Sequence, residues 1–268
     1  MLTRAEIRAR AIALLRAAGS ETAALDADVL LAHATGAGKE ELYAHPELPV
    51  ADADAERFLA LAERRAAGEP VAYLRGFKEF YGLRFAVDRR VLIPRPETET
   101  LVDAARVFVR ERGAALVADV GTGCGAIAVA LAVNEARARV IATDLSADAL
   151  AVALENVRWH GVADRVELRR GDLLAPLTER VDAVVANLPY LREDALQHLA
   201  GERTSLAFEP RVAVVAGPEP LALLRRCVAQ LPRVLAPGGA AFFECDPPQA
   251  RALAAEHGGS LIRDLAGA

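Results

Sequence analysis

Four consecutive residues, Asn187-Leu188-Pro189-Tyr190, follow an apolar, β-branched run (181–186) of the kind found in central parallel strands. Asn187 offers a side-chain amide oxygen as a hydrogen-bond acceptor. The Leu188 carbonyl offers a second acceptor, because Pro189 restricts the preceding residue to an extended conformation. Tyr190 adds a ring that can stack on a planar group. Two acceptors and a ring suit a substrate with a planar NH2 group.

A second segment, Asp119-Val120-Gly121-Thr122-Gly123-Cys124-Gly125, lies upstream between a predicted strand and a predicted helix. Its three glycines let the backbone turn sharply and approach a ligand without a Cβ clash. The free N–H groups at the start of the helix can receive a carboxylate, such as that of S-adenosylmethionine. Asp119 is placed to accept from the ammonium group of the same molecule, directly or through water.

Two further carboxylates follow the next predicted strands. Asp144 can accept both ribose hydroxyls of a nucleoside. Asp172 can accept the adenine amino group, and Leu173 can cover the adenine face. A dinucleotide-binding dehydrogenase is the rival interpretation, but its fingerprint is Gly-x-Gly-x-x-Gly, whereas the spacing here is Gly-x-Gly-x-Gly. The whole set favours a methyl donor, and hence methyl transfer to an amide or amino nitrogen.

The chemistry expected from these two segments depends mainly on positioning. An amide nitrogen is a poor nucleophile, so acceptors that favour a pyramidal nitrogen would bind the transition state better than the ground state. Alignment of the reactants can supply on the order of 7–11 kcal/mol of the barrier. An ordinary turn is the alternative for the Asn-Leu-Pro-Tyr segment, since Asn and Pro are common turn residues. Its place at the end of the fourth predicted strand favours a site.

The elements that must position these residues alternate between strand and helix from about residue 96 onward. The expected strands are 116–120, 140–144, 166–169, 181–186, 239–244 and 260–262. The expected helices are 97–112, 125–134, 146–160, 220–235 and 249–257. This rhythm predicts an α/β fold, with a Rossmann-like, mainly parallel sheet covered by helices on both faces. Ligands bind such sheets outside the carboxyl ends of the strands, where both segments lie.

The rest of the chain predicts two smaller parts. Residues 1–75 read as a small helical bundle, which begins with a capping box of Thr3 and Glu6. Further helices are expected at 22–34, 39–43 and 51–67. Residues 76–95 gather aromatic side chains around Gly82 and read as a β-hairpin linker. The domains predicted are therefore 1–75, 76–95 and 96–268.

Composition narrows the class of protein. The chain has 268 residues, a hydrophobic fraction of 53% and a net charge of −5, which argues against a long nucleic-acid groove. Its three cysteines are scattered and, like its histidines, have no metal spacing, so we expect a reduced cytoplasmic protein without a metal. We expect neither a signal peptide nor a membrane span.

The chain resembles the release-factor glutamine methyltransferases (the PrmC/HemK family) over nearly its whole length. The likeness rests on the two segments above and on further segments that resemble those of the family: Glu69-Pro70-Val71-Ala72-Tyr73, Phe80-Tyr81-Gly82-Leu83, Leu92-Ile93-Pro94-Arg95-Pro96-Glu97-Thr98-Glu99, Glu209-Pro210-Arg211 and Asp264-Leu265-Ala266-Gly267. The Pro-Arg-Pro-Glu-Thr-Glu run is also a plain helix start, because proline and acidic residues favour the first turn. Physics alone gives it no catalytic role.

The resemblance implies a class I S-adenosylmethionine-dependent methyltransferase. Gly121 to Gly125, Asp144, Leu173 and Asn187 would contact the methyl donor, and Asn187 to Tyr190 would hold a glutamine side chain. The substrate would be the glutamine of the Gly-Gly-Gln loop in class 1 peptide chain release factors, methylated at N5. The helical domain would dock the release factor. We expect a monomer that binds neither a membrane nor, directly, nucleic acid.

Three departures from the family stand out. Leu188 replaces the first proline of Asn-Pro-Pro-Tyr, which keeps the carbonyl but is expected to loosen the loop. Cys245 follows Glu244 where glycine is commoner. The chain stops soon after Gly267, where members usually continue through a final strand, so we expect an incomplete sheet edge.

Two other functions stay open at this point. The Asn-Leu-Pro-Tyr segment also resembles the loop of ribosomal-RNA adenine N6-methyltransferases, whose substrate NH2 is planar too. The acidic balance and the helical domain favour a protein substrate. The departures also leave room for a non-catalytic protein that binds S-adenosylmethionine.

Overall fold

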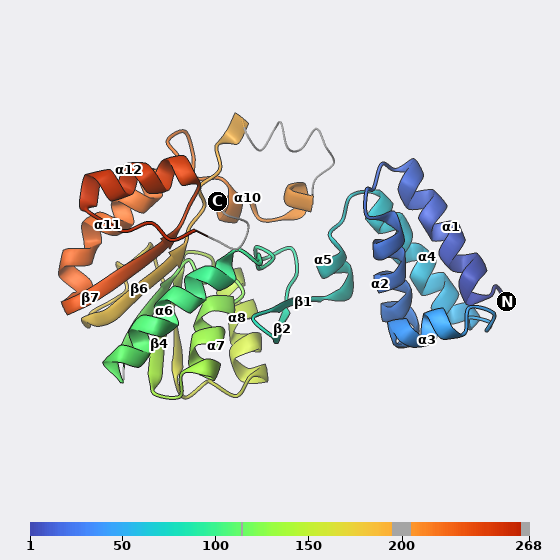
Figure 1. Ribbon diagram of the computed structural model, residues 1–268, viewed down its shortest axis with the longest axis horizontal. Coiled ribbons are helices and arrows are strands. Elements are labelled where there is room, and N and C mark those ends of the chain that lie inside the picture. Colours follow the sequence, from blue (N-terminus) through green and yellow to red (C-terminus); the bar gives the residue numbers. More distant parts are fainter. Residues whose placement is uncertain (114, 195–204, 264–268) are drawn as a thin grey trace. The chain divides into compact units, whose positions relative to one another are not determined.

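The computed structural model describes residues 1–113, 115–194 and 205–263 and divides into two compact units (Figure 1). The first unit holds Met1–Gly76 and the short 3-10 helix η1 (Ser205–Phe208). The second begins at Phe77 and takes in the described residues from Glu209 onward. The predicted hairpin clusters with this second unit.

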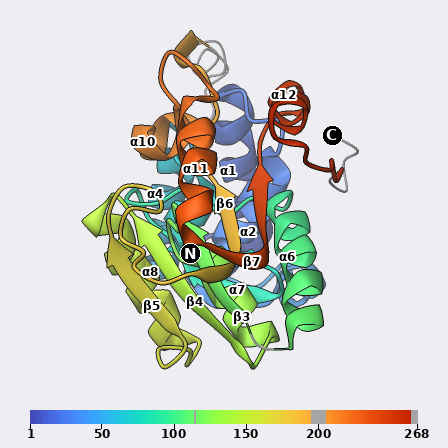
Figure 2. The same ribbon diagram turned by 90° about the vertical axis from the view of Figure 1, so that its left-hand side faces the viewer.

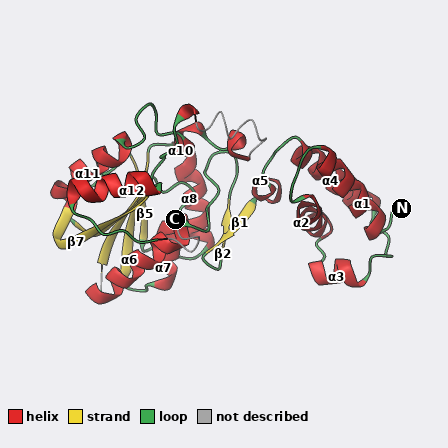
Figure 3. Cartoon of the chain, turned by 45° about the horizontal axis from the view of Figure 1, so that its top comes forward, coloured by secondary structure: helices red, strands yellow, loops and turns green. Residues whose placement is uncertain are grey.

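The first unit is helical apart from an isolated bridge, as predicted (Figure 3). It contains α1 (Arg4–Ala17), α2 (Ala23–Thr35), α3 (Lys39–Ala44), α4 (Asp52–Ala66) and α5 (Val71–Arg75). The predicted capping box of Thr3 and Glu6 is present. Ile7, Leu30 and Phe58 are fully buried in a core that the first four helices share. The five-residue α5 is too short to show helical periodicity, so the sequence did not predict it.

The second unit opens with the predicted hairpin, β1 (Phe77–Phe80) and β2 (Leu83–Ala86). The turn residues Tyr81 and Gly82 both have positive φ, at 54° and 71°. Two such residues match the twist of antiparallel strands. The Tyr81 N–H donates to a Glu99 oxygen (2.7 Å), which ties the turn to the segment that precedes the main sheet.

The main sheet of the described residues has five strands, all parallel: β3 (Ala115–Val120), β4 (Ala138–Asp144), β5 (Val166–Arg170), β6 (Val181–Asn187) and β7 (Leu235–Glu244). Figure 2 shows them in the order β5-β4-β3-β6-β7. The strand order reverses between β3 and β6, which is where ligands bind such sheets. Because Val120 and Ala186 are register partners, the carboxyl ends of these two strands lie side by side.

Helices cover both faces of this sheet. α6 (Thr98–Arg112) packs against β6 and β7, whereas α7 (Ala126–Asn134) and α8 (Ala147–Trp159) pack against β4 and β5. On the other face α11 (Ala222–Val234) contributes Leu224 and Cys227 to a core with Ala118 and Val184. This unit also contains α10 (Arg211–Val214) and α12 (Pro247–His257). This is the predicted class I methyltransferase architecture.

One predicted element is wrong. Residues 260–262 form no strand, and Leu261 and Ile262 are more than half exposed, so they lack the buried face of a strand at the sheet edge. The family-like segment Asp264-Leu265-Ala266-Gly267 lies outside the described residues. Among the residues that the structure describes, no helix has the length and hydropathy needed to cross a bilayer.

Candidate active site

The glycine-rich segment forms a tight loop between β3 and α7. Gly121, Gly123 and Gly125 have φ of +72°, +57° and +82°, a region that disfavours side chains. The N–H groups of Gly121 and Thr122 donate to the Thr143 carbonyl, at 2.9 and 3.0 Å. The loop is therefore tied to the end of β4, the neighbouring strand.

Open space lies beside Gly123. A Cβ added there would meet no heavy atom of the described residues within 4 Å, whereas one added at Gly121 would lie 3.0 Å from Leu188 Cδ2. Leu188 is only 4% exposed. The glycine loop and the Asn-Leu-Pro-Tyr segment are therefore direct neighbours, as the pairing of β3 with β6 requires.

Asp119 lies beneath this loop, fully buried. Its Oδ2 accepts from Thr122 Oγ1 (2.6 Å) and from the Ala128 N–H (3.0 Å). Its Oδ1 is buried without a hydrogen-bond partner among the described residues. Burial raises the pKa of this carboxyl to about 7, against the lowering effect of the two hydrogen bonds. An unmatched acidic oxygen at this position suits a cationic group.

Asp144 shapes the loop from the end of β4. Its Oδ2 accepts from the Gly123 N–H and its Oδ1 from the Ser146 N–H, both at 2.9 Å. Each carboxylate oxygen retains a further lone pair. Asp144 is therefore oriented by the backbone and can still accept hydroxyl groups, as the ribose prediction needs.

Asp172 and Leu173 follow β5 and differ in their surroundings. Asp172 is ion-paired with Arg226 of α11, a partner that the sequence did not reveal. Leu173 is 7% exposed and has a φ of +51°, which is unusual for a residue with a side chain. Its carbonyl accepts from Thr143 Oγ1 at 3.0 Å, which helps to hold this conformation.

The acceptor segment begins at the last residue of β6. Asn187 Nδ2 donates to Thr98 Oγ1 (2.9 Å) and to Glu244 Oε1 (3.0 Å). The Tyr190 carbonyl accepts from Gln249 Nε2 at 3.0 Å. Burial, followed by the nearby carboxyls of Glu244 and Asp246, raises the pKa of the Tyr190 phenol to about 12.

Several residues that support these loops were not predicted as site residues. Asn156 is 1% exposed and bridges two segments: its Oδ1 accepts from the Ala86 N–H (2.7 Å), and its Nδ2 donates to the Ala86 (3.0 Å) and Cys124 (2.8 Å) carbonyls. Cys124 itself is a predicted site residue; burial raises the pKa of its thiol to about 12, so this side chain stays neutral. For Thr98 the only signal in the sequence was the Pro-Arg-Pro-Glu-Thr-Glu run.

The Glu209-Pro210-Arg211 segment also supports the region before α6. Glu209 is 6% exposed, and its carboxylate accepts from the Ile93 N–H (2.9 Å) and from Arg95. One buried acid thus joins two segments that lie far apart in the sequence. The sequence analysis named Glu209 only through the family resemblance and gave no chemical reason for it.

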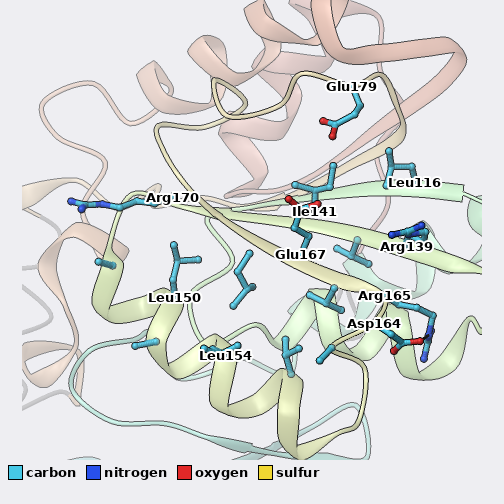
Figure 4. A pocket seen from close by; sticks show the side chains of 17 residues that line it. Leu116, Arg139, Ile141, Leu150, Leu154, Asp164, Arg165, Glu167, Arg170 and Glu179 are labelled. Carbon is cyan, nitrogen blue, oxygen red and sulfur yellow. Dashed lines mark ion pairs between the residues drawn. The ribbon is translucent and has the colours of Figure 1, made fainter.

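A hollow of about 990 Å³ lies away from these loops, along the edge strand β5 and helix α8 (Figure 4). It contains none of the predicted site residues. Its three arginines are balanced by three acidic residues: Arg139, Arg165 and Arg170 against Asp164, Glu167 and Glu179. These balanced charges favour neither an anionic nor a cationic ligand. The loops at the ends of β3 and β6 remain the candidate site.

Leu188 provides a test of the packing between the two loops. We expect Leu188→Ala to lower the free energy of unfolding by about 2 kcal/mol, the low end for a buried leucine, since the loop can partly collapse. Chemical denaturation measures this change. The control is Leu154→Ala on α8, where the leucine is 36% exposed. Equal losses in both variants would mean that Leu188 is not a packing residue.

Comparison with known proteins gives two family matches and many relatives. The model described as "PrmC N-terminal domain" matches residues 6–76, and "Methyltransferase small domain" matches residues 99–204. The release factor glutamine methyltransferase of Moorella thermoacetica is 42% identical and covers 96% of this chain and 93% of its own length. That of Bordetella pertussis is 44% identical, with 91% of each chain covered.

A solved structure is similar at lower identity. The hMettl16 catalytic domain in complex with a MAT2A 3'UTR hairpin has a TM-score of 0.52 and 17% identity, over 76% of this chain and 72% of that one. At this identity the likeness shows the fold alone.

Proposed function

We propose a function for this chain from the premise that it belongs to the release factor glutamine methyltransferase family, a membership that its identity with full-length relatives establishes. The chain transfers a methyl group from S-adenosylmethionine to the side-chain nitrogen N5 of a glutamine in a peptide chain release factor. We assign that glutamine to the Gly-Gly-Gln loop of class 1 release factors. The observation that carries the proposal is the direct contact between the glycine loop and Leu188 at the switch in strand order.

The residues at the ends of β3, β4 and β5 fit the methyl donor. Gly123 leaves space for a ligand, and the unmatched Asp119 Oδ1 suits its ammonium group. Asp144 would accept its ribose hydroxyls, and Leu173 would lie against its adenine. When bound, S-adenosylmethionine supplies an electrophilic methyl group on a sulfonium. Asp172 can serve the adenine amino group only by sharing its carboxylate with Arg226.

The segment after β6 would hold the glutamine. Asn187 Oδ1 and the Leu188 carbonyl would accept the two N–H groups of its carboxamide, and the Tyr190 ring would stack on its plane. These acceptors stabilise a pyramidal nitrogen, whose lone pair is available for attack. Because its pKa is about 12, the Tyr190 phenol stays protonated and does not act as a base. The nitrogen loses its proton after methyl transfer.

The helical unit would dock the release factor. In support, it carries the match to the PrmC N-terminal domain, and the net charge of −5 does not favour nucleic acid. We propose a cytoplasmic location, since release factors act on ribosomes there, and we further propose that the protein acts as a monomer.

Mass spectrometry of a class 1 release factor incubated with this protein and S-adenosylmethionine tests the function. We expect one added methyl group, on the Gly-Gly-Gln glutamine. Ribosomal RNA with labelled methyl donor is the competing substrate. Label on RNA alone would overturn the proposal in favour of an adenine methyltransferase, and donor binding without transfer would favour a non-catalytic protein.

The raised pKa of Asp119 predicts that both stability and donor binding depend on pH. The folded protein holds this proton up to about pH 7, while an unfolded chain releases it near 3.8, so the folded state binds more protons between these values. The free energy of unfolding of the ligand-free protein therefore falls as pH rises across this window. A bound ammonium group favours the carboxylate, so donor binding at pH 6 should release a proton.

Calorimetry in buffers of different ionisation enthalpy measures this proton release. Asp119→Asn should remove it and flatten the dependence of donor affinity on pH. Equal proton release by the wild-type and variant proteins would show that another group is responsible.

A further inference from the structure

We propose that Glu244 and Thr98 are positioning residues that fix the orientation of the Asn187 carboxamide, and that Glu244 decides which of its polar atoms faces the substrate. The inference rests on the proposed function, in which Asn187 Oδ1 accepts from the substrate nitrogen. It gives a role to Thr98 in the Pro-Arg-Pro-Glu-Thr-Glu run, which the sequence explained only as a helix start.

Three elements bring these side chains together. Asn187 ends β6 and Glu244 ends β7, and the two are register partners, so their side chains share one face of the sheet. α6 covers that face: Phe108 of α6 lies edge-on against Phe242 of β7, with ring centroids 5.9 Å apart. Thr98 is the first residue of α6 and is 5% exposed.

Both hydrogens of the Asn187 amide group have an acceptor. Nδ2 lies 2.9 Å from Thr98 Oγ1 and 3.0 Å from Glu244 Oε1. An amide NH2 has two hydrogens, so its donor capacity is used within the protein. The atom left for a ligand is Oδ1, which can accept from an N–H.

The two partners differ in what they specify. A carboxamide can rotate by half a turn and exchange its oxygen and nitrogen. A hydroxyl can donate or accept, so Thr98 is compatible with either orientation. A carboxylate only accepts, so Glu244 would repel Oδ1 in the reversed orientation. Glu244 therefore sets the orientation, and Thr98 holds it.

A reversed carboxamide would present NH2 to the substrate NH2, donor against donor. The substrate would lose one of its two acceptors, and the nitrogen would no longer be aligned for attack. The effect would fall on turnover and not on folding.

Glu244→Gln and Thr98→Val test the inference. The glutamine amide can donate as well as accept, so it no longer distinguishes the orientations, while valine removes the acceptor that faces Nδ2. With the release factor as substrate, we expect kcat to fall about 10- to 100-fold in Glu244→Gln, the range for a hydrogen bond to a charged group, and about 2- to 10-fold in Thr98→Val, the range for a neutral one. The affinity for S-adenosylmethionine and the thermal midpoint should stay near wild type. The matched controls, Glu111→Gln on exposed α6 surface and Thr98→Ser with its hydroxyl, should keep full activity.

Asn187→Asp provides a readout that a merely structural role would not give. A carboxylate at position 187 has two acceptor oxygens, so its orientation no longer matters, but it repels Glu244. Adding Glu244→Gln should therefore raise the activity of the Asn187→Asp protein, although it lowers that of the otherwise wild-type protein. If Glu244→Gln lowers the activity of the wild-type and Asn187→Asp proteins alike, or changes neither, the inference is wrong. The proposed function still stands in that case if the wild type methylates the release factor.

Amide hydrogen exchange tests the orientation without any substrate. The Asn187 side-chain NH2 should exchange slowly in the wild type and in Thr98→Ser, and faster in Glu244→Gln, as measured by NMR. This readout separates the two proposals. If the wild type methylates no release factor but protects this NH2 from exchange, the proposed function is refuted and the positioning of Asn187 by Glu244 and Thr98 stands. Equal exchange rates in the wild type and in all the variants would refute the positioning role of Glu244 and Thr98.

Discussion

Asn187→Ala is expected to lower kcat for the release factor by about 1000-fold, while S-adenosylmethionine affinity changes little. The alanine removes the side-chain acceptor that would align the substrate nitrogen, and misplacement of about 1 Å alone can cost 100-fold. Loss of the acceptor interaction in the transition state adds to this. Single-turnover measurement of methyl transfer, with calorimetry of donor binding, separates the two effects.

The fold should survive this change, because Asn187 is only partly buried. The matched control is Asn134→Ala at the far end of α7, where Nδ2 donates to the Ala130 carbonyl at 2.9 Å. It should keep wild-type turnover at a similar small cost in stability. Unchanged turnover in Asn187→Ala would refute the assigned role.

The parts of the site that could be predicted are those that local sequence determines. The glycines at 121, 123 and 125 needed a left-handed backbone, and the structure gives all three positive φ. The apolar runs before Gly121 and Asn187 predicted buried strands, and parallel strands place their carboxyl ends at one edge of the sheet. Their direct adjacency depends on the strand order, which the sequence alone did not give.

The side chains that support the site could not be predicted in the same way. Thr98 and Glu244 lie 89 and 57 residues from Asn187, and Arg226 lies 54 residues from Asp172. The pairing of β6 with β7 places Glu244 beside Asn187. The packing of α6 and α11 on opposite faces of the sheet supplies Thr98 and Arg226. A buried polar group needs partners, so the sequence predicts that they exist without naming them.

Some short elements were not predicted from the sequence, for a related reason. α5 and α10 are too brief for a helical period to register. The apolar residues at 261–262 suggested a strand, yet a strand needs a paired neighbour, and these residues are exposed. Hydrophobic pattern is therefore informative where an element spans the core and weak where a few residues lie at its margin.

Gly123→Ala is expected to lower the affinity for S-adenosylmethionine about 100-fold. The added methyl group would enter the open space beside the loop, where the ligand would have to lie against the backbone. Such overpacking costs about 1–3 kcal/mol, and a tenfold loss corresponds to about 1.4 kcal/mol. Isothermal titration calorimetry measures the affinity, and denaturation measures the separate cost to folding.

Gly161 separates the ligand effect from backbone strain. Its φ is +65°, close to the +57° of Gly123, and a Cβ there also meets no heavy atom of the described residues within 4 Å. Each alanine should therefore cost a similar free energy of folding, about 1–2 kcal/mol. Since Gly161 lies at the opposite end of α8 from the glycine loop, Gly161→Ala should keep donor affinity. Equal affinities of the two variants for S-adenosylmethionine would mean that the donor does not occupy the space beside Gly123. A different part of the loop region would then form the donor-binding site.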